Sequence, residues 1–119
     1  MDLGLSENIV DSQTVVEVRG DVDIHTAPQL RDRLIDVLTG GGKSVIVDLT
    51  SLTFMDSTGL GALVAARTHA EETNATLRIV CPSERLLKLF RITGLDRVFA
   101  IYASVPLAVA AGSLPSAAS

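Results

Sequence analysis

The stretch Ser44-Val45-Ile46-Val47-Asp48-Leu49 decides the fold, because it is a nearly continuous apolar run rich in β-branched residues. Such a run predicts a central strand that is covered on both faces, as strands are in parallel sheets flanked by helices. Helix-like patterns precede and follow it in the sequence. Strands that alternate with helices indicate an α/β fold with a mixed, mainly parallel sheet.

Four further segments are predicted to be strands, at residues 3–10, 14–19, 75–80 and 98–101. The turn formers Asp11-Ser12-Gln13 separate the first two, so we expect that pair to be antiparallel. In the second strand, apolar and charged side chains alternate with the period of a half-buried strand. Residues 20–23 are expected to end it.

Four segments carry helix signals, at residues 26–39, from Asp56 or Ser57 to about Asn74, 83–93, and from about Pro106. Thr26 with Gln29 three residues later predicts a capping box at the first of these. The predicted order is therefore β-β-α-β-α-β-α-β-α. The helix positions expected in the core are Leu30, Leu34, Val37, Leu38, Leu60, Leu63, Val64, Ala70, Leu86, Leu87, Phe90 and Ile92.

The 119 residues suffice for one domain, which we assign to residues 1–111, with 112–119 as a flexible tail. A net charge of −4, 3% aromatic residues and no Trp argue against a nucleic-acid partner. The single cysteine, Cys81, fits a reducing compartment. Polar or turn-forming residues interrupt every apolar stretch, and the acidic start is no signal peptide, so we expect a cytoplasmic protein without membrane contact.

The segment Phe54-Met55-Asp56-Ser57-Thr58-Gly59-Leu60-Gly61 carries the densest chemical signal. It places a carboxylate and two hydroxyls at a strand-to-helix junction, where binding residues of α/β sheets gather. Its plainest interpretation is N-capping with close helix–sheet packing, since Asp and Ser are common caps.

Enzymatic and nucleotide-binding readings of this segment are incomplete. A serine hydrolase elbow requires GxSxG, but Met55 stands at the first glycine, and the available histidines are His25 and His69. A dinucleotide fingerprint lacks its third glycine. The triplet Gly42-Lys43-Ser44 resembles a Walker loop but lies before a strand instead of a helix.

A phosphoryl-accepting receiver domain has a similar length, and Asp56 at a strand end could accept the group. That chemistry needs an adjacent acidic pair for magnesium, whereas Asp21 and Asp23 alternate. It also needs a lysine near the fifth strand, and the chain has only Lys43 and Lys88.

There remains a hydroxyl on which another protein acts. A helix start favours an anion, and a phosphate on Ser57 adds about −1.5 to −2 charges there. The helix would tolerate this charge, but a partner docked on the same surface would lose several kcal/mol to like-charge repulsion. Phosphorylation of Ser57 is therefore predicted to act as a release switch.

Four stretches carry a close resemblance to the STAS-domain anti-sigma factor antagonists of bacteria. They are residues 20–27 (GDVDIHTA), 47–49 (VDL), 54–61 (FMDSTGLG) and 86–90 (LLKLF) running into Gly94-Leu95, in the family's order and spacing over residues 3–103. The resemblance implies a non-enzymatic STAS domain without cofactor or metal, phosphorylated at Ser57 and not at Thr58.

The resemblance also implies partners. When unphosphorylated, the protein is expected to bind an anti-sigma factor that is a serine kinase, and so to free a sigma factor; a serine phosphatase would reverse the kinase reaction. The implied docking residues are Asp21, Asp23, His25, Thr26, Asp56, Ser57, Thr58, Gly59, Leu60 and Gly61. Taken alone, Asp23 is a turn residue and His25 a solvated loop residue.

Two points stay open at this stage. The alternative function is a STAS scaffold or a transporter-associated STAS subunit without a phospho-switch. The free protein is expected to be a monomer, although the sequence does not determine its oligomeric state. The apolar surplus, with a mean hydropathy of +0.38, predicts a docking face around Leu60 in addition to the core.

Overall fold

The computed structural model describes residues 3–113, in which six strands form one mixed sheet. The elements follow in the order β1 (Leu3–Val10), β2 (Gln13–Val22), α1 (Ala27–Thr39), β3 (Ser44–Asp48), β4 (Leu52–Met55), α2 (Ser57–Glu72), β5 (Thr76–Val80), α3 (Glu84–Ile92), the 3₁₀ turn η1 (Leu95–Arg97), β6 (Ala100–Tyr102) and α4 (Val105–Ser113). The sheet order is β1-β2-β3-β5-β6, with β4 paired to β2.

The predicted α/β class and the pairing directions are confirmed. β1 pairs with β2 antiparallel through the tight turn at Asp11 and Ser12, both at positive φ. All other pairs are parallel. The central strand β3 is buried from Val45 to Asp48, as its apolar run predicts.

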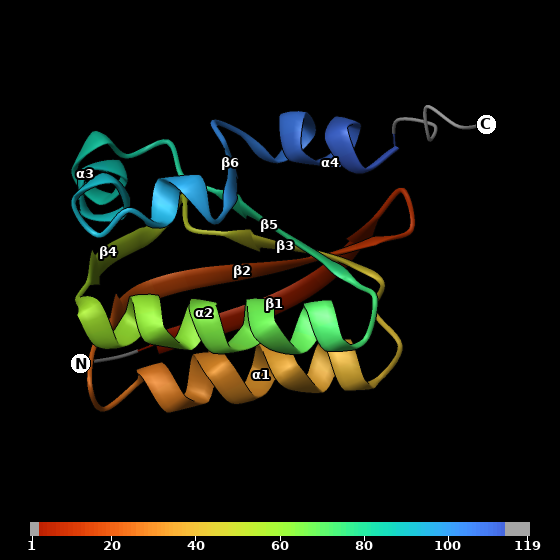
Figure 1. The fold of residues 1–119 in the computed structure, drawn as a ribbon, viewed down its shortest axis with the longest axis horizontal. Helices are drawn as coiled ribbons and strands as arrows, with labels where there is room; N and C mark the ends of the chain where they lie inside the picture. The colour runs from red at the N-terminus through yellow and green to blue at the C-terminus, as the bar shows by residue number, and fades with distance from the viewer. Residues whose placement is uncertain (1–2, 114–119) are drawn as a thin grey trace.

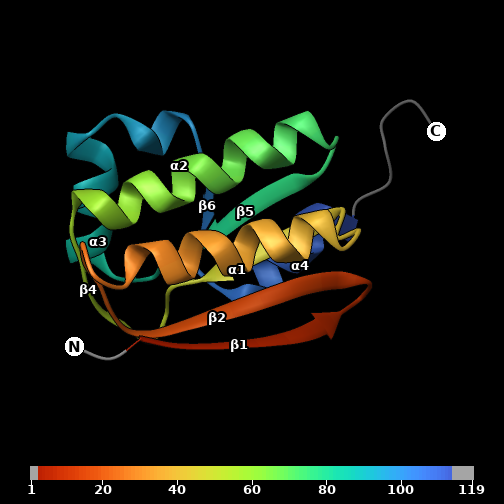
Figure 2. The same cartoon turned by 90° about the horizontal axis from the view of Figure 1, so that it is seen from below.

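Helices cover the sheet from two sides (Figures 1 and 2). The helices α1 and α2 lie side by side on one face and enclose the main core with α3, whose Leu86 and Phe90 are buried as predicted. On the other face, α4 packs its Ala108 and Val109 against Val15, Ile46 and Val80. The buried Gln13 amide ties this helix to the sheet, because its Nε2 donates to the Val109 carbonyl at 2.8 Å.

The strand β4 was not predicted, and it determines where α2 begins. Its four residues are buried at both ends and exposed in the middle, so they lack the alternation that marks a strand. It forms because β2 continues to Val22, past its predicted end, through a register shift at Gly20. Gly20 has φ +93°, which glycine adopts without strain. β2 pairs with β3 as far as Glu17 and with β4 from Gly20 onward.

Several finer predictions are wrong. Val64 and Ile92 are 37% and 72% exposed instead of lying in the core. The last strand is Ala100–Tyr102, because Gly94 at φ +75° starts the turn η1 before it. Gly112 and Ser113 belong to α4 instead of a tail. The rest of the predicted tail, residues 114–119, lies outside the described residues.

Candidate functional site

The paired ends of β2 and β4 bring the two predicted docking segments together. Val22 is the register partner of Met55, and the Asp56 N–H donates to the Val22 carbonyl at 3.2 Å. The loop that follows β2 and the start of α2 therefore leave the sheet side by side. Carboxyl ends of parallel strands form binding sites for this geometric reason.

The start of α2 is capped by Asp56 and not by Ser57. Asp56 Oδ1 accepts hydrogen bonds from the N–H groups of Thr58 at 3.0 Å and Gly59 at 3.3 Å, and from the Thr58 hydroxyl. The Thr58 hydroxyl is thus committed to the cap. The Ser57 side chain is exposed and makes no hydrogen bond within residues 3–113. Of the two adjacent hydroxyls, Ser57 is the one that is free to react.

The loop before α1 is held by its own side chains. Asp23 Oδ1 accepts from the N–H groups of His25 at 2.8 Å and Thr26 at 3.0 Å, and the Thr26 hydroxyl donates to the Asp21 carbonyl at 2.8 Å. The predicted capping box is therefore wrong: Thr26 makes no side-chain cap bond to α1, because its hydroxyl is turned back onto this loop. Thr26 is buried, so it orders the loop from beneath.

Desolvation alone would raise the pKa of Asp23. The backbone hydrogen bonds from His25 and Thr26, followed by the Thr26 hydroxyl and the nearby His25 charge, outweigh it and lower the pKa below its usual range. Asp23 is thus an ionised member of the loop whose negative charge the loop itself stabilises. The two carboxylates that follow paired strand ends, Asp23 and Asp56, make the surface beside Ser57 acidic before any phosphate is added.

Not every residue predicted to dock is on the surface. His25, Ser57, Thr58 and Gly61 are exposed, and Asp21, Asp23 and Asp56 are half-buried. Gly59 and Leu60 are buried. The Leu60 side chain is only 3% exposed and belongs to the main core, so an apolar docking face around this position, which stays a prediction, would consist of its neighbours in the sequence.

The two glycines of α2 have different surroundings. A Cβ on Gly59 would lie 2.6 Å from Met55 Cγ and 2.9 Å from Val22 Cγ1, so glycine lets α2 approach the sheet. A Cβ on Gly61 would meet nothing within 4 Å. Its bare backbone instead leaves room in a groove on the surface.

That groove runs between the starts of α1 and α2 and has a volume of about 290 Å³. We call it the α1–α2 groove; its rim is formed by Ile24, Pro28, Arg31, Thr58, Gly61 and Ala65. Ile24 is 66% exposed and adds apolar surface to the rim of this groove. The groove is mostly apolar, carries one guanidinium, and begins beside Ser57.

Residues 5–108 match the family model described as the STAS domain. The chain belongs to the STAS domain family. It is 34% identical over 95 residues to the anti-sigma-B factor antagonist of Staphylococcus aureus, covering 80% of this chain and 88% of that protein.

Solved structures agree on the fold of this STAS domain. An anti-sigma factor antagonist from Mycobacterium paratuberculosis superposes with a TM-score of 0.81 at 27% identity, covering 92% of this chain and 93% of that one. The Bacillus cell fate determinant SpoIIAA in its phosphorylated form gives 0.69 at 22% identity, covering 93% and 99%, a likeness that concerns the fold alone.

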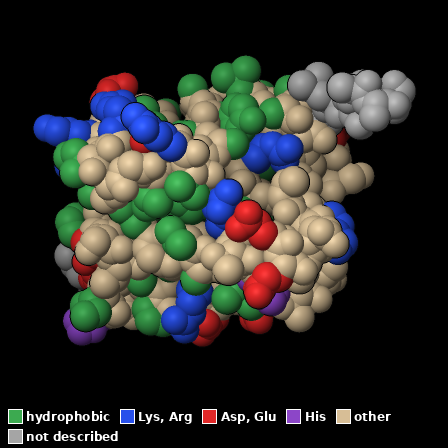
Figure 3. All heavy atoms as spheres, in the orientation of Figure 1, with side chains coloured by type: hydrophobic (Ala, Val, Ile, Leu, Met, Phe, Trp, Pro, Cys, Tyr) green, Lys and Arg blue, Asp and Glu red, His purple; other side chains and the backbone are tan. Residues whose placement is uncertain are grey.

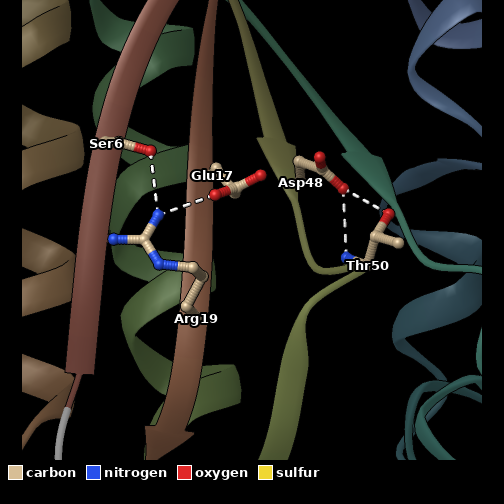
Figure 4. Close-up of polar contacts among 5 residues, drawn as sticks. All are labelled: Ser6, Glu17, Arg19, Asp48 and Thr50. Carbon is tan, nitrogen blue, oxygen red and sulfur yellow. Dashed lines mark hydrogen bonds and ion pairs between the residues drawn. The ribbon is translucent and has the colours of Figure 1, made fainter.

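Sequence reasoning gave no role to Asp48, which holds the turn before β4 in this STAS domain. Asp48 Oδ1 accepts from the Thr50 N–H at 3.0 Å and the Thr50 hydroxyl at 2.5 Å, which closes the turn between β3 and β4 (Figure 4). The same sheet face carries Arg19 bonded to Ser6 and Glu17. The turn directs the chain into β4, and β4 ends directly before Asp56.

Neither a metal-binding cluster nor a membrane-spanning helix is found among the described residues. Residues 3–113 contain no cluster of three or more His, Cys, Asp or Glu residues arranged to hold a metal ion. No helix in that same range has the length and apolar character needed to span a membrane. Cys81 is a buried free thiol, and burial raises its pKa, which leaves it protonated and unreactive.

Proposed function

We propose that this STAS protein is a phosphorylation-controlled anti-sigma factor antagonist. Unphosphorylated, it binds an anti-sigma factor that is a serine kinase and thereby frees a sigma factor. The kinase phosphorylates Ser57, the complex dissociates, and a serine phosphatase restores the active form. The protein itself performs no catalysis, needs no cofactor, and acts in the cytoplasm.

The observation that carries this proposal is the contrast between Ser57 and Thr58. The Ser57 hydroxyl is exposed and unbonded, whereas the Thr58 hydroxyl is bound to Asp56. A kinase must bring a hydroxyl in line with the γ-phosphate, which an exposed first-turn serine permits. The names of the Staphylococcus aureus relative and of the phosphorylated SpoIIAA structure support the same function.

The docking surface that we propose comprises the β2–α1 loop, the first turns of α2 and the α1–α2 groove. Ile24 and Pro28 supply exposed apolar contact on the α1 side. On the α2 side the groove is lined by Thr58, Gly61 and Ala65. A partner bound to this surface covers Ser57 and therefore comes into direct contact with a phosphate on that residue.

The phosphate acts locally and not by unfolding the helix. It adds about −1.5 to −2 charges at the first position of α2, where the helix dipole favours an anion. On a partner docked over Asp23 and Asp56, the same charge adds to two carboxylates. Like-charge juxtaposition at an interface costs several kcal/mol.

The experiment that tests this proposal incubates the protein with the anti-sigma factor kinase of its source organism and ATP. Mass spectrometry should map a single phosphate to Ser57. Ser57→Ala should remain unmodified, and Thr58→Ala should be modified as the wild type is. Modification at another residue, or none, would refute the switch and favour a scaffold or transporter-associated STAS module.

A further inference from the structure

A second groove opens on the other side of β4 from the start of α2. We call it the β4–α3 groove; it has a volume of about 290 Å³ and is lined by Thr53, Phe54, Met55, Arg85, Leu86 and Leu89. Phe54 is 47% exposed there. The lining side chains are apolar apart from Thr53 and Arg85, and Arg85 Nη2 donates to the Thr53 carbonyl at 2.8 Å.

The outer face of α3 extends this groove. Arg85, Lys88, Leu89 and Ile92 are spaced at three and four residues, so they form one continuous stripe along the helix. Leu89 is half-buried, and Ile92 is 72% exposed at the end of the stripe. The apolar surface of α3 therefore exceeds what the core covers and continues outward from the groove.

The helix α3 and the turn after it are rich in positive charge although the protein is acidic. Residues 84–97 contain four of the ten Lys and Arg residues and only two acidic residues, Glu84 and Asp96. Lys and Arg side chains gather over the α3 corner in the space-filling view (Figure 3). Arg91 pairs with Glu84 at 3.3 Å, whereas Lys88 has no ionic partner within residues 3–113.

The groove lies next to the surface around Ser57, Asp23 and Asp56, which we call the Ser57 surface. The Ser57 surface is negatively charged, whereas the side chains along the groove and α3 include the cations Arg85 and Lys88. Met55 lines the groove, and Asp56 and Ser57 follow it directly in the chain. A protein that docks over Ser57 and extends past β4 to α3 thus meets the carboxylates of Asp23 and Asp56 on one side of β4 and the cations Arg85 and Lys88 on the other. Such a bipolar surface fixes the register of a partner, because each half repels the charge that the other attracts.

We propose that the β4–α3 groove is a second contact site for the same partner, and that it receives an acidic amphipathic segment of that protein. An apolar side chain of the segment packs against Phe54 and Leu89, and its carboxylates face Arg85 and Lys88. This inference rests on the proposed function, since the occupant is part of the anti-sigma factor that docks over Ser57.

The test compares two charge reversals on one helix, Lys88→Glu and Arg91→Glu. Both change the net charge equally, but Lys88 belongs to the stripe with the groove-lining residues Arg85 and Leu89, whereas Arg91 is already paired with Glu84. Affinities are measured by calorimetric titration with the purified anti-sigma factor of the source organism. Lys88→Glu should lower the affinity by about tenfold or more relative to wild type, the size expected for one lost charge pair. Arg91→Glu should stay within about twofold.

Salt and an apolar variant sharpen the comparison. Raising the ionic strength should reduce the difference between Lys88→Glu and wild type, because exposed charges are screened. Ile92→Ser, at an exposed site, should also weaken binding without lowering the unfolding temperature. Equal affinities for Lys88→Glu and Arg91→Glu would overturn the inference, whether both are reduced or both are unchanged.

A third variant separates this inference from the function on which it rests. If Ser57→Asp weakens binding while Lys88→Glu does not, the Ser57 surface is the contact and the groove proposal fails alone. If neither the wild type nor Ser57→Asp binds the anti-sigma factor measurably, both proposals fail. Amide shifts of the ¹⁵N-labelled protein in residues 85–92 on adding the partner should agree with the affinities.

Discussion

Two helices of this protein begin beside a serine, and the two serines have different roles. At α3, Ser83 is the N-cap, because its hydroxyl accepts a hydrogen bond from the Leu86 N–H at 3.4 Å. At α2, Asp56 is the N-cap, so Ser57 occupies the first helical position, and its exposed hydroxyl makes no hydrogen bond within residues 3–113. A serine at a helix start is therefore structural or available according to the residue that precedes it.

The largest effect that we expect comes from adding a charge at each serine in turn. Ser57→Asp should weaken binding to the anti-sigma factor by about a hundredfold or more, which corresponds to about 2.7 kcal/mol. Its unfolding temperature should stay level or rise slightly, because the helix dipole favours the anion. Calorimetric titration and circular dichroism measure the two quantities.

Ser83→Asp is the matched control for that substitution. Aspartate is a good N-cap, so α3 should keep its stability, and Ser83 lies outside the Ser57 surface. The affinity should fall far less than for Ser57→Asp. A loss as large as that of Ser57→Asp would mean that net charge, and not the place of the charge, governs binding.

The two glycines of α2 give the next effect, on stability. Gly59→Ala should lower the free energy of unfolding by about 1–3 kcal/mol, because the added methyl group overlaps Met55 and Val22. Gly61→Ala meets open space and should stabilise the helix by about 0.5–1 kcal/mol. Urea denaturation separates them, and a destabilised Gly61→Ala would contradict the open groove.

The caps themselves provide a smaller stability difference. Asp56→Ala removes an acceptor of three hydrogen bonds and should cost about 1–2 kcal/mol, near the upper end for N-caps. Ser83→Ala removes one long hydrogen bond and should cost about 0.5–1 kcal/mol. If Ser83→Ala proved the more damaging in denaturant titrations, Asp56 would not be the dominant cap.

The smallest effect concerns pH and the loop before α1. The folded pKa of Asp23 lies below its unfolded value, so its stabilisation is complete above about pH 4 and is lost as the pH falls through the folded pKa. Asp23→Asn should therefore lose less stability than the wild type between pH 5 and pH 2, within the range of about pH 1–5 over which such a carboxylate titrates. Identical losses in thermal melts would remove Asp23 as a contributor.

The sequence predicted the parts of this fold that local patterns encode. The run of residues 44–49, the turn at Asp11 and Ser12, and the helix ends near residues 39 and 93 were recognised from composition and spacing. The strand β4 was missed because it exists through its pairing with β2 beyond the Gly20 bulge, a contact over 30 residues of chain. Four residues without alternation give no local sign of it.

The site was predictable to the same extent. Asp56 and Ser57 were identified as its centre from residue types at a helix start, but the choice between them as cap needed coordinates. The Thr26 hydroxyl was assigned to α1 because the spacing to Gln29 fits a capping box, whereas the neighbouring Asp21 carbonyl takes it. Ile24, an isolated apolar residue in a polar loop, was a usable signal for the α1–α2 groove.

The central claim is that a phosphate on Ser57 decides whether the partner binds. The direct measurement compares the dissociation constant of the anti-sigma factor for the unphosphorylated protein and for the protein phosphorylated at Ser57, both checked by circular dichroism. We predict unchanged spectra and a dissociation constant at least about a hundredfold higher after phosphorylation. Equal dissociation constants for the two forms would contradict the account.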